Sequence, residues 1–186
     1  MRYYLLSAWS IFDPLYYRFT RLTKLQDSGT ARNIFRVRLT RYKGRDVILS
    51  DGTHITKNDL LVKVHLHNVR LLTDLYSIRS EVRKAKLIFY HVQRSLPGIE
   101  GYIRFHKRSN EIKGIIGITT LCTGSTRLGF EVFSISNLVY KWLKWATFLP
   151  ITLLSANELP IKKLVKKPPP SYLFMSKDKL SKLYKI

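Results

Sequence analysis

Apolar and polar residues alternate along two stretches of the chain, residues 35–40 and residues 60–66. Alternation of this kind is typical of strands that bury one face. Between the two stretches, an Asp51-Gly52 dipeptide separates short apolar runs, which favours a tight hairpin. The pattern therefore predicts a three- or four-stranded antiparallel unit in this part of the chain.

Two other segments have the apolar spacing of a helix. Residues 2–24 are apolar on one side, and residues 69–96 keep their apolar positions on one broad face. Pro97-Gly98 is expected to end the second helix, and Ser80 can cap a break within it.

A further strand follows the central helix. Residues 115–122 are apolar on both faces, so this strand is expected to lie centrally under helices. Residues 127–133 are expected beside it, after a turn at Gly124-Ser125. The fold class predicted is α+β, a small antiparallel or mixed β-sheet packed by N-terminal, central and C-terminal helices.

The last third of the chain has a different composition, because every basic residue after Arg127 is a lysine. Over residues 137–149, leucine and tryptophan share one helical face and lysines the other. Such a helix suits a membrane interface, and the alternative is an ordinary amphipathic helix packed on the sheet. The candidate residues for docking on a membrane or another polyanion are Lys141, Trp142, Lys144, Trp145, Lys162, Lys163, Lys166 and Lys167.

The length of 186 residues suits one domain. Residues 1–167 are expected to form it. Residues 168–186 are expected to be a tail that begins with prolines and ends in a short helix capped by Ser176. Cys122 is the single cysteine, which excludes a disulfide framework and a cysteine-based zinc cluster.

The net charge of the chain indicates which class of partner it binds. The chain has 33 Lys and Arg against 12 Asp and Glu, a formal net charge of +21. Such a charge repels itself unless it faces nucleic acid, anionic lipid or an acidic glycopolymer. The longest nearly uncharged run, residues 145–156, is shorter than the about 20 residues of a transmembrane helix. We expect the protein in the cytoplasm or peripherally at the inner face of the membrane.

The strand residues that face away from the core carry the most informative polar groups. His65 and His67 point the same way from one strand and could share a metal ion, but their cationic neighbours disfavour a divalent cation. We therefore expect no metal. Arg36 and Arg38, with His65, His67 and Asn68, are instead expected to bond an anionic or hydroxylated ligand, or simply solvent.

Motifs for catalysis are missing from the sequence. Cys122 lies in an apolar stretch, and the glycines match neither a nucleophile elbow, a phosphate-binding loop nor a dinucleotide fingerprint. Carboxylates are sparse, with no obvious pair for hydrolysis. We assign no catalytic residue and expect no cofactor.

Several motifs run along nearly the whole chain in a shared spacing. They are RVRLTRYKG (36–44), LSDG (49–52), Asp59, VHLHNVRL (64–71), GITTL (117–121) and RLGF (127–130). In these motifs the chain resembles the YkoP-like family of spore-forming Firmicutes, whose biochemical role is not established.

Domains of that family occur alone or attached to polysaccharide deacetylase domains, which implies a setting in cell-envelope or sporulation glycopolymer metabolism. No deacetylase domain is present in these 186 residues. The positions that the resemblance transfers are Arg38, Asp51, Gly52, His65, Asn68, Arg127 and Gly129. With the strand residues above, the candidate ligand-binding set is Arg36, Arg38, Asp51, His65, His67, Asn68 and Arg127.

Three functions remain open from the sequence. The leading one is a non-enzymatic accessory protein that engages an anionic lipid or an envelope glycopolymer. The second is nucleic-acid binding, which predicts a steep loss of affinity with salt. The third is an enzyme acting on an envelope sugar or lipid-linked precursor, which requires His65, with Arg38 or Asn68, to line a concave pocket.

Overall fold

Strands β2 (Phe35–Arg41) and β5 (Leu60–Leu66) form the antiparallel pair that their alternating residues predict. Val37 lies opposite Val64 and is fully buried. Branched and aromatic side chains of this kind pack well on a pleated, half-buried surface. The pair therefore forms because each strand places its apolar residues on the same face.

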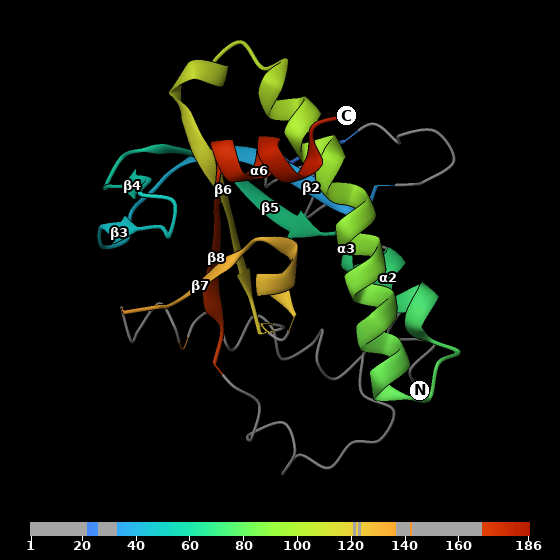
Figure 1. The fold of residues 1–186 in the computed structure, drawn as a ribbon. Helices are drawn as coiled ribbons and strands as arrows, with labels where there is room; N and C mark the ends of the chain where they lie inside the picture. Colours follow the sequence, from blue (N-terminus) through green and yellow to red (C-terminus); the bar gives the residue numbers. More distant parts are fainter. Residues whose placement is uncertain (1–21, 26–32, 121, 123, 137–141, 143–168) are drawn as a thin grey trace.

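The computed structural model describes residues 22–25, 33–120, 122, 124–136, 142 and 169–186 (Figure 1). Within these ranges, a six-stranded sheet has the order β1-β2-β5-β6-β8-β7, and β3 pairs with β4 in a separate hairpin. Strand β6 runs parallel to β5, and the other described pairs are antiparallel. The remaining strands are β1 (Thr23–Lys24), β3 (Val47–Ile48), β4 (His54–Ile55), β6 (Ile112–Thr119), β7 (Glu131–Ser134) and β8 (Ser171–Ser176).

Helices α2 (Asn68–Leu75) and α3 (Glu81–Arg104) connect β5 to its parallel neighbour β6, and α6 (Lys177–Tyr184) follows β8. The predicted break before α3 is confirmed, because Ser80 caps this helix through its side chain. Ser176 caps α6 in the same way, as the sequence predicts. The fold is α+β, with a mixed sheet.

The sheet has two different faces. Helices α3 and α6 lie across one of them, which we call the helix face (Figure 1). The β3–β4 hairpin packs on the other, the hairpin face, where Tyr42, Leu61 and Phe174 form part of a second core. Adjacent residues of β8 divide between the faces, because Met175 belongs to the helix-side core and Phe174 to the hairpin-side core. Two short 3₁₀ helices, η1 (Ser109–Glu111) and η2 (Ser125–Leu128), complete the described elements.

The prediction that the central helix ends at Pro97-Gly98 is wrong, because α3 continues to Arg104 with Pro97 inside it. Ile99 and Ile103 extend its buried face beyond the proline, and each is at most 2% exposed. A proline in a helix interior costs about 3 kcal/mol. Burying one isoleucine side chain contributes about 1.5–3 kcal/mol. The two isoleucines together therefore outweigh the proline.

The prediction of which strand lies beside β6 is also wrong. Residues 127–133 do not pair with β6, whose neighbours are β5 and β8, and β7 pairs with β8. The partner comes instead from residues 171–176, in the segment that was expected to be a tail. These residues form β8 inside the sheet, and Leu180 of α6 is buried in the helix-side core. Strand β6, which is apolar over residues 114–118, therefore gains its second neighbour from residues 171–176.

Two further corrections concern the first half of the chain. Residues 23–24, expected at the end of a helix, form β1 and pair with Val37 and Arg36. The β3–β4 hairpin forms at Asp51-Gly52 as predicted, but as a sheet of its own rather than within one antiparallel unit.

The other expected helical segments lie mainly outside the described residues. These are residues 2–21 and residues 137–149, apart from the helical residue Trp142. Among the helices that the structure describes, none has the length and apolar character needed to cross a bilayer.

Candidate functional site

The hairpin face of β2 and β5 carries cations on directly opposite positions. Side chains alternate along a strand, and since Val37 fills the helix-side core, Arg36 and Arg38 lie on the hairpin face. Arg36 is registered opposite His65, and Arg38 opposite Lys63. Like charges placed directly opposite each other on antiparallel strands are destabilising.

Arg36 has a structural contact that the sequence does not reveal. Its side chain is only 5% exposed, and its Nη2 lies 2.7 Å from Nε2 of His67. A guanidinium can only donate, so Nε2 accepts and the ring proton is on Nδ1. With its proton there, Nδ1 cannot accept, so the 3.5 Å approach of the Arg70 amide to Nδ1 is not a hydrogen bond in this tautomer. Arg36 and His67 together tie β2 to the start of α2.

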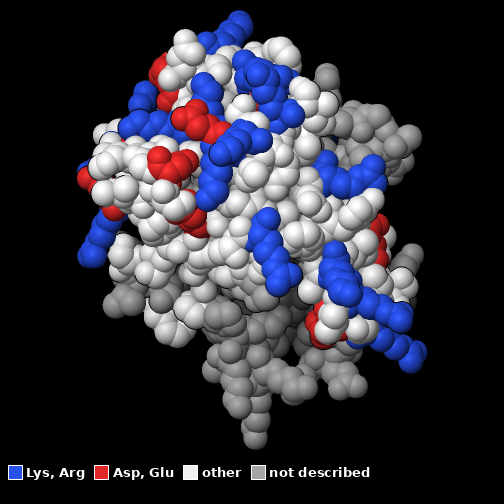
Figure 2. Space-filling view, in the orientation of Figure 1, with Lys and Arg blue, Asp and Glu red and all other residues white. Residues whose placement is uncertain are grey.

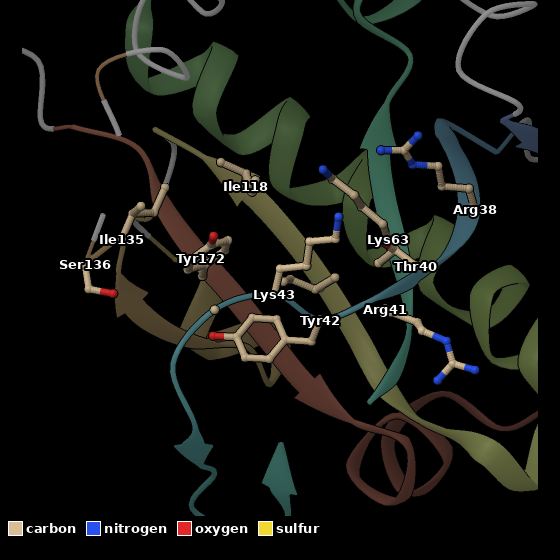
Figure 3. Close-up of a pocket in the computed structure, with 12 residues that line it drawn as sticks. Arg38, Thr40, Arg41, Tyr42, Lys43, Lys63, Ile118, Ile135, Ser136 and Tyr172 are labelled. Atoms are coloured by element: carbon tan, nitrogen blue, oxygen red, sulfur yellow. The ribbon is translucent and has the colours of Figure 1, made fainter. Parts of the chain in front are cut away.

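A cavity of about 400 Å³ lies beside the Arg38–Lys63 pair, and we call it the cationic pocket (Figure 3). Among its described lining residues four are basic and none is acidic. These residues are Arg38, Thr40, Arg41, Tyr42, Lys43, Gly44, Lys63, Ile116, Ile118, Ile135, Ser136 and Tyr172. A volume of this size is typical of a small-molecule site.

The lining of the cationic pocket is divided by chemistry. In Figure 3 the charged ends of Arg38, Lys43 and Lys63 gather on one side, whereas Ile118 and Tyr172 lie on the other. Arg41 points away from this group, and its Nη1 donates to the Asn58 carbonyl at 3.0 Å. The charge facing the pocket therefore comes from Arg38 on β2, Lys63 on the neighbouring strand β5, and Lys43 just after the end of β2.

Tyr42 forms a wall of the pocket rather than a reactive group. It is 5% exposed, and its hydroxyl donates to the Arg45 carbonyl at 2.8 Å. Burial raises the pKa of Tyr42, and the negative charge of Asp46 acts in the same direction. Any side chain at position 44 would collide with the Tyr42 hydroxyl, which explains why Gly44 occupies it.

Asp51, which was expected in the ligand-binding set, instead docks the hairpin turn onto the C-terminal helix. Its carboxylate accepts hydrogen bonds from the Ser176 hydroxyl and, at 3.0 Å, from the Thr53 amide. Burial acts to raise the pKa of Asp51, but these hydrogen bonds and the Lys179 charge outweigh it and hold the pKa below its ordinary value.

A second carboxylate extends this contact. Glu131 accepts from the Ser50 amide at 2.9 Å and from the Ser50 hydroxyl at 2.6 Å, and pairs with Lys179 at 3.1 Å. We call Ser50, Asp51, Glu131, Ser176 and Lys179 the turn network. Lys179 also donates to the Ser50 hydroxyl at 3.4 Å, so the turn network joins the β3–β4 turn to β7 and α6.

The structure separates the remaining expected site residues. Arg127 is exposed on η2, which packs on the helix face, because Leu128 belongs to the helix-side core. Arg127 is thus on the opposite face from Arg38. Asn68 begins α2, and its side chain is not among those described.

His65 shares the hairpin face but is not a described lining residue of the pocket. The described lining therefore does not provide the combination of His65 with Arg38 that the enzyme hypothesis requires.

The expected docking residues are largely outside the described part of the chain. Trp142 is described and is 66% exposed. The others lie outside the described residues, namely Lys141, Lys144, Trp145, Lys162, Lys163, Lys166 and Lys167.

Sequence reasoning missed most of the pocket. Lys43 and Lys63, which line the pocket, were not among the expected site residues. Ile118 and Tyr172 carry no chemical signal in the sequence, since apolar and aromatic residues are common in every strand.

The chain forms an α+β domain with a cationic pocket on one face of its sheet, and comparison with known proteins places it in a family. The model of the YkoP domain matches residues 2–184, so the chain belongs to the YkoP family. It is 48% identical over 179 residues to "Uncharacterized protein YkoP" of Bacillus subtilis (strain 168), with 96% of this chain and 95% of that protein covered. No solved structure matches the chain. The family expected from the motifs is therefore confirmed.

Proposed function

We propose that this protein is a non-enzymatic accessory protein that binds an anionic group in the cationic pocket. The group is a phosphate or carboxylate carried by an anionic lipid or a cell-envelope or spore glycopolymer. The observation that carries the proposal is the direct opposition of Arg38 and Lys63 beside Lys43, with no acidic residue in the described lining.

Electrostatic repulsion within the site supports this proposal. Neighbouring cations on adjacent strands repel each other, and an anion bound between them would reduce that repulsion. A phosphate or carboxylate accepts several charge-assisted hydrogen bonds at once, and the fork of donors on Arg38 suits both groups. The overall charge of +21 would also attract a polyanion from a distance.

Calorimetric titration with inorganic phosphate, pyrophosphate and acetate tests the proposal. We expect saturable binding that weakens with added salt. Lys63→Met and Lys43→Met should each weaken it at least about tenfold, because each removes a charged hydrogen-bond donor worth about 1.5–3 kcal/mol.

Lys86→Met is the matched control, because Lys86 is an exposed lysine of α3 on the helix face. It removes the same charge without touching the pocket. Equal losses in Lys86→Met and Lys63→Met would mean that the anions respond only to net charge, and the proposal would fail.

Nucleic-acid binding is the competing outcome. It would appear in a gel-shift titration as tight binding of an oligonucleotide with steep salt dependence. Retention of that binding in Lys63→Met and Lys43→Met, together with no binding of the small anions, would favour it over the proposed function.

A further inference from the structure

The cationic pocket has an apolar side that a simple anion would leave unused. Ile118 of β6, Tyr172 of β8 and Ile135 just beyond β7 are described lining residues of the cavity. Figure 3 shows them across the pocket from the charged ends of Arg38 and Lys63. The polar and apolar halves of the lining therefore face one ligand space from two directions.

The sheet pairing explains why the two halves adjoin. Lys63 of β5 is registered beside Ile116 of β6, and Ile118 is paired across with Tyr172 of β8. Moving from β5 to β8 along the hairpin face thus changes the surface from cationic to apolar within neighbouring strands. One further residue of each kind comes from a loop, Lys43 after β2 and Ile135 after β7.

A ligand that fits this lining must have two chemical parts. An inorganic anion bonds the cations but makes no contact with the apolar side, and a neutral apolar molecule makes no charge-assisted hydrogen bond with the cations. Small-molecule sites usually combine an apolar wall with a few polar groups that orient the ligand. An amphiphilic anion meets both requirements at once.

We infer that the ligand of the cationic pocket is an amphiphilic anion, with a phosphate or carboxylate against Arg38, Lys43 and Lys63 and an aliphatic portion against Ile118 and Tyr172. This inference rests on the proposed function and narrows its ligand class. An aliphatic rather than aromatic portion is favoured, because Ile118 and Ile135 offer neither a stacking face nor hydrogen bonds to a base edge, and of the three apolar-side residues named above only Tyr172 has a ring.

Calorimetric titration with inorganic, butyl and hexyl phosphate, all below micelle-forming concentrations, tests the inference. Affinity should rise along the series by up to about fourfold for each methylene that becomes buried. Hexanol, which lacks the charge, should not bind measurably. A nucleoside monophosphate should bind more weakly than hexyl phosphate.

Two variants test the apolar side and the cationic side of the pocket separately. Ile118→Thr keeps a branched strand residue and should abolish the gain in affinity with chain length. Lys63→Met should weaken every phosphate. Ile48→Thr is the matched control, because Ile48 is a strand residue that is 61% exposed and outside the described lining, so it should keep the full series. Thermal denaturation confirms that each variant is folded.

The outcomes distinguish this inference from the proposed function. Equal affinity for inorganic and hexyl phosphate overturns the inference while the anion site stands. An unchanged chain-length gain in Ile118→Thr, or tighter binding of the nucleotide than of hexyl phosphate, also overturns it. No binding of any anion would overturn both.

A competition experiment identifies whether the amphiphile is a membrane lipid or a soluble molecule. Vesicles that contain phosphatidic acid compete with hexyl phosphate if the natural ligand is a membrane lipid, whereas vesicles of neutral lipid do not. Binding of hexyl phosphate without competition from either vesicle assigns the ligand to soluble amphiphiles. Both results support the inferred ligand class.

Discussion

Lys63 lies on β5, the third of the six strands in the order of the sheet, opposite Arg38 and across the pocket from its apolar side. Lysine is depleted in strands, where a branched or aromatic residue packs better. Residues that serve binding often reduce stability, so a less functional side chain at such a position can be the more stable one.

Lys63→Met should therefore make the ligand-free protein more stable. Removing one of two opposed cations should raise the free energy of unfolding by about 0.2–1 kcal/mol. That corresponds to an increase of the melting temperature by up to about 4 °C. Thermal denaturation at low ionic strength measures the effect, which should shrink as salt screens the repulsion.

The direction of this change is the critical result. Lys86→Met should leave the melting temperature nearly unchanged, because Lys86 is exposed on a helix away from the pocket. If Lys63→Met instead lowers the melting temperature of the ligand-free protein, Lys63 stabilises the sheet and the repulsion argument is wrong.

The site could be predicted only in part from single residues. Arg38 was identified because arginine on a strand that also buries apolar residues is conspicuous. Asp51 was expected in the same site as Arg38. A turn residue can contact many parts of a fold, however, and Asp51 accepts a hydrogen bond from Ser176, which is distant from it in the sequence. Ile118 and Tyr172 become site residues only through the pairing of β6 with β8.

At the scale of elements, the turn network holds the β3–β4 hairpin against the junction of β8 and α6. Ser176 has two roles there, since its hydroxyl accepts from the Lys179 amide at 3.0 Å and donates to Asp51. It is 1% exposed, so both bonds are shielded from water. One side chain thus caps a helix and docks a hairpin.

Ser176→Ala should destabilise the protein by about 2–3 kcal/mol. Loss of an N-cap costs about 1 kcal/mol, and the buried hydrogen bond to Asp51 adds about 1–2 kcal/mol. Urea denaturation measures the change. In a double-mutant cycle with Asp51→Ala, the two losses should be less than additive, because both remove the same contact.

Ser80→Ala is the natural comparison, because Ser80 caps α3 and is an exposed residue outside the turn network. It should cost about 1 kcal/mol. A loss in Ser176→Ala no greater than in Ser80→Ala, with full additivity toward Asp51→Ala, would show that the hairpin contact contributes nothing.

The elements differ in how far local sequence determines them. Both helix caps could be predicted, since a cap bonds the backbone only a few residues away. The passage of α3 through Pro97 could not, because it depends on burial of Ile99 and Ile103 against the sheet. The pairing of β7 with β8 was missed for the same reason, since partners distant in sequence leave no local pattern.

At the scale of the whole molecule, three carboxylates join elements that are distant in the sequence. Asp51 and Glu131 belong to the turn network. Asp59 accepts from the Thr56 amide at 2.6 Å and pairs with Lys113 of β6 at 2.9 Å. Burial acts to raise the pKa of Asp59 and of Glu131, but hydrogen bonds and lysine charges outweigh it and lower both.

Stability should therefore fall in acid. The ordinary pKa values are 3.8 for Asp and 4.5 for Glu, and Asp51, Asp59 and Glu131 all lie below them in the folded protein. The unfolded chain thus binds protons more readily, so the stabilisation is complete above these values and is lost as the pH falls through the lowered ones. The melting temperature, followed from pH 7 to pH 3, should be level at first and then decline.

Replacing the carboxylates tests the cause of that decline. The combined variant Asp51→Asn and Glu131→Gln should be less stable at pH 7 and should lose less stability on acidification than the parent protein. An equal decline in both proteins would assign acid sensitivity to the growing positive charge of the chain as a whole.

The position of β8 has a consequence for how the protein is made. A ribosome releases the chain from its N-terminus, so β6 emerges with one edge that has no neighbour until residues 171–176 follow. An apolar strand with an unpaired edge invites association with other chains. Strand β7 also lacks its neighbour until the same residues are made, because β8 is its partner. The sheet thus cannot be completed before residues 171–176 are synthesised, and nascent chains that lack them should depend on chaperones.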